Sequence, residues 1–83
     1  MKISIEISLY PLDKNYSQSI RDFISRISTY ENVDIRYHPM STQISGDYDT
    51  CMRLLNTELK RSLEQDKTMA SVIKIINLDM SDT

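Results

Sequence analysis

The chain of 83 residues has one cysteine, one histidine, one glycine and no tryptophan. A single cysteine excludes an intrachain disulfide and indicates a reducing, cytoplasmic setting. One cysteine and one histidine are too few for a Cys/His metal site, so no metal is expected. One glycine cannot build a glycine-rich phosphate-binding loop, and no other cofactor motif is present.

Other features are missing as well. No apolar run approaches the ~18 residues of a membrane span. The N-terminus enters an alternating pattern at once, so no signal peptide is expected. The formal net charge of −2, with both signs interspersed, lacks the basic stripe of a nucleic-acid-binding surface. We therefore expect one small domain with a thin core over residues 1–78, followed by a polar, frayed tail at residues 79–83.

Hydrophobic periodicity predicts the elements of this domain. Residues 2–10 alternate between apolar and polar side chains, which predicts a half-buried strand. Residues 15–29 carry apolar side chains at helical spacing, which predicts a helix. Three more segments read as strands: residues 33–38, 40–45 and 69–78. A second helix follows Asp47, and its apolar stripe is expected to comprise Tyr48, Met52, Leu55, Leu59 and Leu63.

The order strand, helix, strand, strand, helix, strand is the ferredoxin-like pattern. It predicts an α+β fold, a βαββαβ sandwich in which two helices cover one face of a four-stranded antiparallel sheet. Right-handed crossovers place the first and third strands side by side. The uncovered face then carries a polar patch: Ser4, Glu6, Ser8, Ser41, Gln43 and Ser45.

Two side chains of this patch suit a small polar ligand. Glu6 is either a solvated charge paired with Lys74 or Arg36, or an acceptor for an amine-bearing ligand. The amide of Gln43 donates and accepts at once, as recognition of an aminopyrimidine edge requires. His38 has no Cys or Ser partner fixed by spacing, so no catalytic residue is predicted.

Two segments carry a family resemblance. Residues 6–12, EISLYPL, and residues 40–46, MSTQISG, resemble the paired "SLYP" and "ST-x-x-x-G" segments of the YkoF-like thiamine/hydroxymethylpyrimidine-binding proteins. The resemblance implies that the chain binds thiamine or its hydroxymethylpyrimidine precursor without catalysis and assembles through its sheet. YkoF itself has two such domains in tandem, so a homodimer would supply the second. By motif match, the implied ligand contacts are Ser8, Tyr10, Ser41 and Thr42.

The predicted site therefore has six ligand-binding residues: Glu6, Ser8, Tyr10, Ser41, Thr42 and Gln43. Thr42 falls on the helix side of its strand, so the pocket lies either on the open sheet face or between sheet and helices. Val72 and Ile76 make both faces of the last strand apolar, which predicts a homodimer or homotetramer. The alternative function is a structural or regulatory assembly module that has no small ligand.

Overall fold

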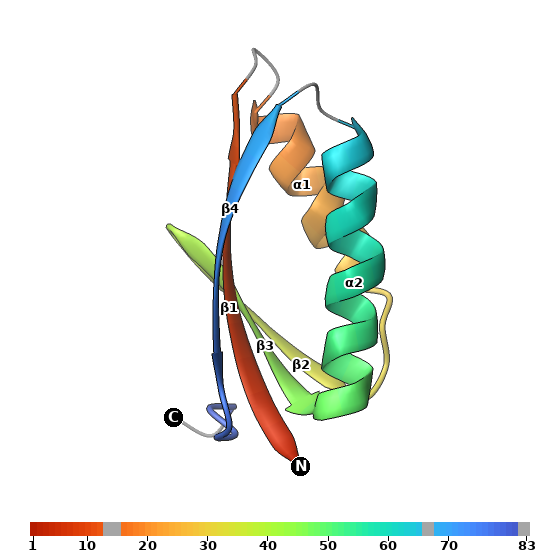
Figure 1. The fold of residues 1–83 in the computed structure, drawn as a ribbon, viewed down its shortest axis with the longest axis vertical. Helices are drawn as coiled ribbons and strands as arrows, with labels where there is room; N and C mark the ends of the chain where they lie inside the picture. Colours follow the sequence, from red (N-terminus) through yellow and green to blue (C-terminus); the bar gives the residue numbers. More distant parts are fainter. Residues whose placement is uncertain (13–15, 66–67, 82–83) are drawn as a thin grey trace.

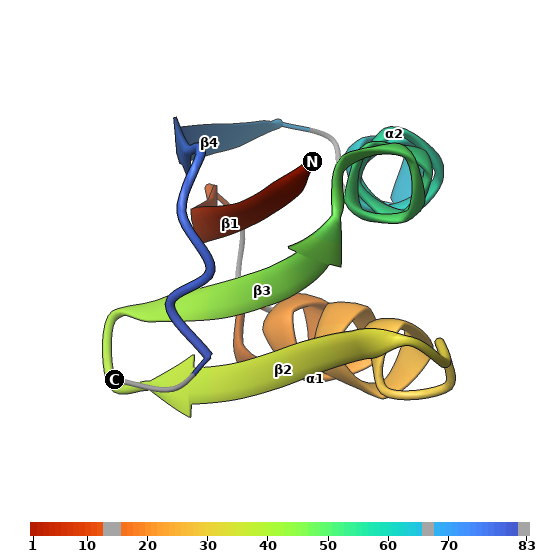
Figure 2. The same ribbon diagram turned by 90° about the horizontal axis from the view of Figure 1, so that it is seen from below.

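A computed structural model describes residues 1–12, 16–65 and 68–81 (Figure 1). It confirms the predicted order of elements and the ferredoxin-like α+β fold. The elements are β1 (Lys2–Pro11), α1 (Tyr16–Ile27), β2 (Val33–His38), β3 (Ser41–Asp47), α2 (Tyr48–Gln65) and β4 (Met69–Ile76). Both helices lie on one face of the sheet, and the other face has no helix over it (Figures 1 and 2).

The strands form one antiparallel sheet in the order β2-β3-β1-β4. The first and third strands are neighbours, as the crossover rule predicts. Ser4 faces Ser45 and Glu6 faces Gln43 across this pair, so the polar patch forms on the face opposite the helices.

Strict alternation in β1 creates the core, because every second side chain points toward the helices. Ile3, Ile5 and Ile7 are almost completely buried there. The other buried apolar side chains come from both helices and β3: Phe23, Ile27, Ile44, Cys51, Leu54 and Leu55. Burial raises the pKa of the Cys51 thiol, with the nearby Asp47 carboxylate adding to the shift, so this cysteine is a core residue of low reactivity.

The buried face of α2 differs from the predicted stripe. Tyr48 and Leu63 are 43% and 46% exposed. Of the predicted stripe, Leu55 is buried, and Met52 and Leu59 are partly buried against the core. The other buried residues of α2 are Cys51, Leu54, Glu58 and Ser62. Apolar periodicity cannot identify Glu58 and Ser62 as buried, because both are polar. They are buried because they bond to Arg26 of α1, which the pattern of α2 alone does not show.

Strand boundaries shift by one or two residues from those expected. β1 extends to Pro11, β4 ends at Ile76, and β3 continues through Gly46 to Asp47. A Cβ on Gly46 would lie 3.1 Å from the carbonyl oxygen of Asn32 and 3.4 Å from the Cys51 sulfur. The single glycine therefore allows close approach of backbone and helix, and its φ is not positive.

The C-terminal tail crosses the open face of the sheet instead of fraying over its described part (Figure 2). The Ser4 hydroxyl donates to the carbonyl of Leu78 at 2.8 Å and accepts from the amide of Met80 at 2.9 Å. Because the only hydroxyl hydrogen of Ser4 is used in the bond to Leu78, the Ser45 hydroxyl must donate to the Ser4 oxygen, at 2.8 Å. Ser4 is saturated and only 3% exposed, so the tail covers this end of the polar patch.

Candidate functional site

A cavity of about 430 Å³ lies between α1 and the sheet, where β1 ends and the β2–β3 hairpin turns. One wall is the apolar stripe of α1, formed by Ile20, Phe23 and Ile24. The other walls are the end of β1 with Leu12, residues 7–12, and the hairpin, residues 37–42. Mostly apolar walls with a few hydroxyls, around a volume in the ~300–1,000 Å³ range, are typical of a small-molecule site.

The structure brings together four of the six predicted site residues. Ser8, Tyr10, Ser41 and Thr42 all line the cavity. These are the residues that the family resemblance implied. The cavity also lies between sheet and helices, which was one of the two positions left open by the sequence.

Glu6 and Gln43 do not line this cavity. Their side chains lie on the open face, where a carboxylate oxygen of Glu6 is 3.2 Å from the Lys74 ammonium. The Gln43 amide donates to the carbonyl of Met80 at 3.4 Å, beneath the tail. Glu6 and Gln43 thus lie outside the cavity, whereas Ser8 and Ser41 of the same polar face line it where the sheet ends.

Thr42 is the most informative polar residue of the cavity. It is 7% exposed and lies on the helix side of β3, opposite Ile7. Among the residues that the structure describes, none forms a hydrogen bond with its hydroxyl. Buried hydroxyls in native proteins almost always have a partner, so a hydroxyl without one among the described residues is a candidate to bind a molecule in the cavity.

The hairpin is fixed to its surroundings on both sides of the cavity. The Ser8 hydroxyl donates to the carbonyl of Met40 at 3.0 Å, which ties the turn to β1. The Ser28 hydroxyl donates to the carbonyl of Ile24 at 2.7 Å, so the Tyr37 hydroxyl must donate to Ser28, at 2.6 Å. Tyr37 thereby bridges from β2 to the end of α1.

Tyr37 and the α1 stripe were missed as site residues by the sequence reasoning. A signal for Tyr37 was present, because it alternates with Val33 and Ile35 and therefore faces the helices. The hairpin register also places it opposite Thr42. His38 lines the cavity too, although the sequence indicated no role for it in the site.

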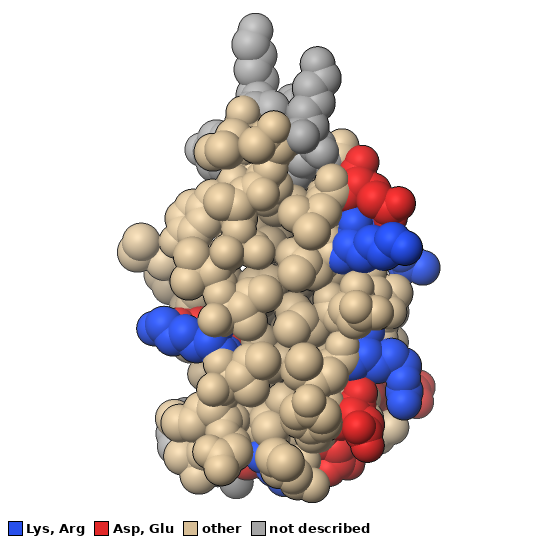
Figure 3. Space-filling model, in the orientation of Figure 1, with Lys and Arg blue, Asp and Glu red and all other residues tan. Residues whose placement is uncertain are grey.

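The described lining of the cavity has no Lys, Arg, Asp or Glu side chain. Charged side chains gather mainly over α2 in Figure 3. Within residues 1–12, 16–65 and 68–81, no three His, Cys, Asp or Glu side chains form a group that could hold a metal ion. None of the described helices is long and apolar enough to cross a membrane. The described lining of the cavity thus offers a ligand apolar contact and a few hydrogen-bonding groups, but no charged side chain.

Known proteins identify this architecture. A Streptococcus pneumoniae protein of known crystal structure superposes with a TM-score of 0.87 and 26% identity, over 96% of this chain and 90% of that one. A candidate thiamine biosynthesis/salvage protein from Thermotoga maritima gives a TM-score of 0.84 at 15% identity, over 99% and 94% of the two chains. A domain of unknown function from Bacillus cereus gives 0.77 at 14% identity, over 98% and 80%. The last two likenesses concern the fold alone.

Among curated proteins, no sequence matches this chain. The family described as "Thiamine-binding protein" matches residues 5–80, which is almost all of the chain. The match spans both segments that resemble the YkoF-like proteins, and it includes the four predicted residues that line the cavity. The chain belongs to the thiamine-binding protein family.

Proposed function

We propose that this protein binds thiamine or its hydroxymethylpyrimidine precursor in the cavity between α1 and the sheet, without catalysis. Family membership supports the class of ligand. The observation that carries the position of the site is the buried Thr42 hydroxyl, which faces the cavity without a described partner. A pyrimidine that bears an amino group and ring nitrogens can satisfy this hydroxyl as donor or acceptor.

The walls match the shape and polarity of such a ring. Ile20, Phe23 and Ile24 offer an apolar surface for one ring face. Ser41 and Tyr10 also line the cavity where the sheet ends, so at the rim Ser41 can add a second hydrogen-bonding group and Tyr10 can cover the ring. In this arrangement, hydrogen bonds from β3 orient the ring and α1 supplies the apolar contact.

The charge of the lining favours free thiamine over its phosphate esters. Binding a phosphate requires a cation or several backbone amides directed at it. The described lining residues include no Lys or Arg. A thiamine phosphate ester would lose its hydration at this site without gaining an ion pair, so its affinity should be lower.

We propose further that the protein acts as a homodimer or homotetramer through the open sheet face, in the cytoplasm. Val72 and Ile76 are 53% and 48% exposed on this face, and burying them against a second copy would remove apolar surface from water. The lone, buried Cys51 suits a reducing compartment. It does not line the cavity, which supports a binding role rather than nucleophilic catalysis.

Two neighbouring residues provide the test, because Thr42 and Gln43 point to opposite faces of β3. Thr42→Val removes the hydroxyl and keeps the shape, and Gln43→Leu does the same for the amide on the open face. Isothermal titration with thiamine and with hydroxymethylpyrimidine should show about 5- to 10-fold weaker binding for Thr42→Val, the worth of one neutral hydrogen bond, and unchanged binding for Gln43→Leu.

The opposite pattern would place the site on the open face beside Glu6. If the wild-type protein bound neither compound at millimolar concentration, the ligand proposal would be wrong. That result would favour the alternative of an assembly module without a small ligand.

A further inference from the structure

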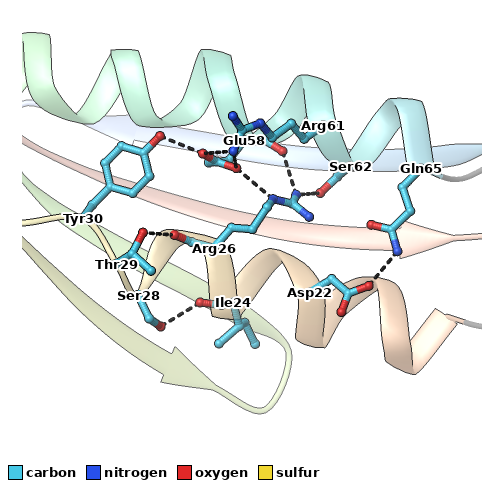
Figure 4. A network of polar contacts seen from close by, with 10 residues as sticks. All are labelled: Asp22, Ile24, Arg26, Ser28, Thr29, Tyr30, Glu58, Arg61, Ser62 and Gln65. Atoms are coloured by element: carbon cyan, nitrogen blue, oxygen red, sulfur yellow. Dashed lines mark hydrogen bonds and ion pairs between the residues drawn. The ribbon is translucent and has the colours of Figure 1, made fainter.

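A buried ionic network joins the two helices on the side of α1 that faces α2 (Figure 4). Its centre is the Glu58 carboxylate of α2, which is 2% exposed. The Arg26 guanidinium of α1 donates to one carboxylate oxygen at 2.8 Å, and the Tyr30 hydroxyl donates to the other at 2.7 Å. Arg61 approaches the same carboxylate at 3.4 Å from the next turn of α2.

Arg26 is held at three points of α2. Besides the carboxylate, its guanidinium donates to the backbone carbonyl of Glu58 at 3.1 Å and to the Ser62 hydroxyl at 2.7 Å. These acceptors lie on successive turns, because Glu58 and Ser62 are four residues apart. The planar guanidinium therefore fits only one translation and one rotation of α1 against α2.

The helix that the network fixes is also a wall of the cavity. Ile20, Phe23 and Ile24 line the cavity from α1, and Arg26 follows within one turn. We propose that Arg26 and Glu58 are positioning residues, which hold α1 at the one placement where its apolar stripe forms the ligand-binding wall. This inference rests on the proposed function, because it concerns the same cavity.

Hydrophobic packing alone would leave this placement poorly defined. Apolar contact is non-directional, and a helix beside a cavity loses few contacts when it slides. A buried ion pair contributes little net stability compared with apolar residues of similar volume, because desolvation offsets the attraction. Its directional bonds can still select one arrangement among several that are similarly packed. The role assigned here is therefore placement of the wall rather than stability of the fold.

The test uses a double variant, Arg26→Met with Glu58→Leu, which replaces the charges by apolar side chains of similar size. Ser62 then keeps a partner, because its hydroxyl can donate to the carbonyl one turn earlier. Gln65→Ala is the matched control, since it removes an exposed bond between the same helices, from Gln65 to Asp22 at 2.7 Å. Val33→Ala, which trims the core outside the cavity lining and the network, controls for loss of stability alone.

Three measurements separate positioning from stability. The free energy of unfolding in urea should be unchanged or higher in the double variant. Amide hydrogen exchange should nevertheless speed up in α1, by about tenfold relative to the sheet, as expected when one helix opens locally. Thiamine affinity should fall by about five- to tenfold, because only a fraction of molecules would have α1 in the competent position. Both controls should keep the wild-type exchange of α1 and wild-type affinity.

Wild-type α1 exchange and wild-type thiamine affinity in a stable double variant would overturn the inference. If the double variant does not fold, Glu58→Gln at neutral pH is measured instead. Its unfolding free energy should fall, because Arg26 loses its charged partner, while the expected and the contradictory results for α1 exchange relative to the sheet and for thiamine affinity stay the same. If wild-type protein does not bind thiamine, the proposed function fails. Amide hydrogen exchange in α1 still decides whether the network positions this helix.

Discussion

Replacing Ser4 by alanine should release the C-terminal tail from the sheet. The Ser4 hydroxyl donates to Leu78 and accepts from Met80 and from Ser45, so one substitution removes three hydrogen bonds at 2.8 to 2.9 Å. Besides these bonds, the described tail has a contact with Gln43, a longer bond of 3.4 Å. Without the hydroxyl, we expect residues 78–81 to leave the open face.

The loss of unfolding free energy in Ser4→Ala depends on whether the polar groups of the released tail regain hydrogen bonds to water. Three bonds at about 1 kcal/mol each set an upper limit of about 3 kcal/mol on the loss of unfolding free energy. Detachment lets the Leu78 carbonyl and the Met80 amide regain water, and it returns conformational entropy to the tail. The expected loss is therefore about 1–2 kcal/mol.

Two measurements check this prediction. Urea unfolding gives the loss of stability, and hydrogen exchange at the Met80 amide reports whether the tail is bound. Ser8→Ala is the matched control, because Ser8 lies on the same face of β1 but makes one exposed bond, to Met40. It should cost a few tenths of a kcal/mol at most and leave Met80 unchanged. Full protection of the Met80 amide in Ser4→Ala would refute the reasoning.

Three further predictions follow from the structure. Gly46→Ala should lower the unfolding free energy by about 1–3 kcal/mol in urea, because its Cβ would crowd the Asn32 carbonyl at 3.1 Å; a wild-type midpoint would contradict this. Burial favours a raised pKa for Glu58, but hydrogen bonds from Tyr30 and Arg26 and the charge of Arg61 outweigh it and hold the pKa below its ordinary 4.5. The ionised Glu58 therefore contributes fully to the unfolding free energy at pH values above 4.5, and this contribution is lost as the pH falls through the lowered pKa. Unfolding free energies measured at decreasing pH should show this loss in the wild type and not in Glu58→Gln. Calorimetric titration should show thiamine diphosphate binding at least tenfold more weakly than thiamine, and equal affinities would argue against the uncharged lining.

The fold was predictable because its information is local. Alternation in β1 marks one buried face, and helical spacing in α1 marks another, so the order of elements alone selects the topology. Four residues that line the cavity could also be named from the sequence, because they lie in the two short segments that carry the family resemblance: Ser8, Tyr10, Ser41 and Thr42.

The remaining features depend on contacts between distant residues. Glu58 is polar and interrupts the apolar pattern of α2, and its partner Arg26 lies 32 residues away. The tail is bound through Ser4, which lies 76 positions before Met80 in the sequence. Periodicity reads one element at a time, so it could indicate neither the buried network nor the covered end of the open face. For the same reason it could not show that Glu6 and Gln43 lie apart from the cavity.

The bound tail also brings the last described residues close to the N-terminal strand. The Met80 amide contacts Ser4, so the last described residues lie beside the start of β1, at the end of the sheet away from the cavity (Figure 1). A short linker between these ends could join two copies head to tail and leave both cavities open. Such a tandem protein would have two sites at fixed stoichiometry, and their equivalence could be measured by titration.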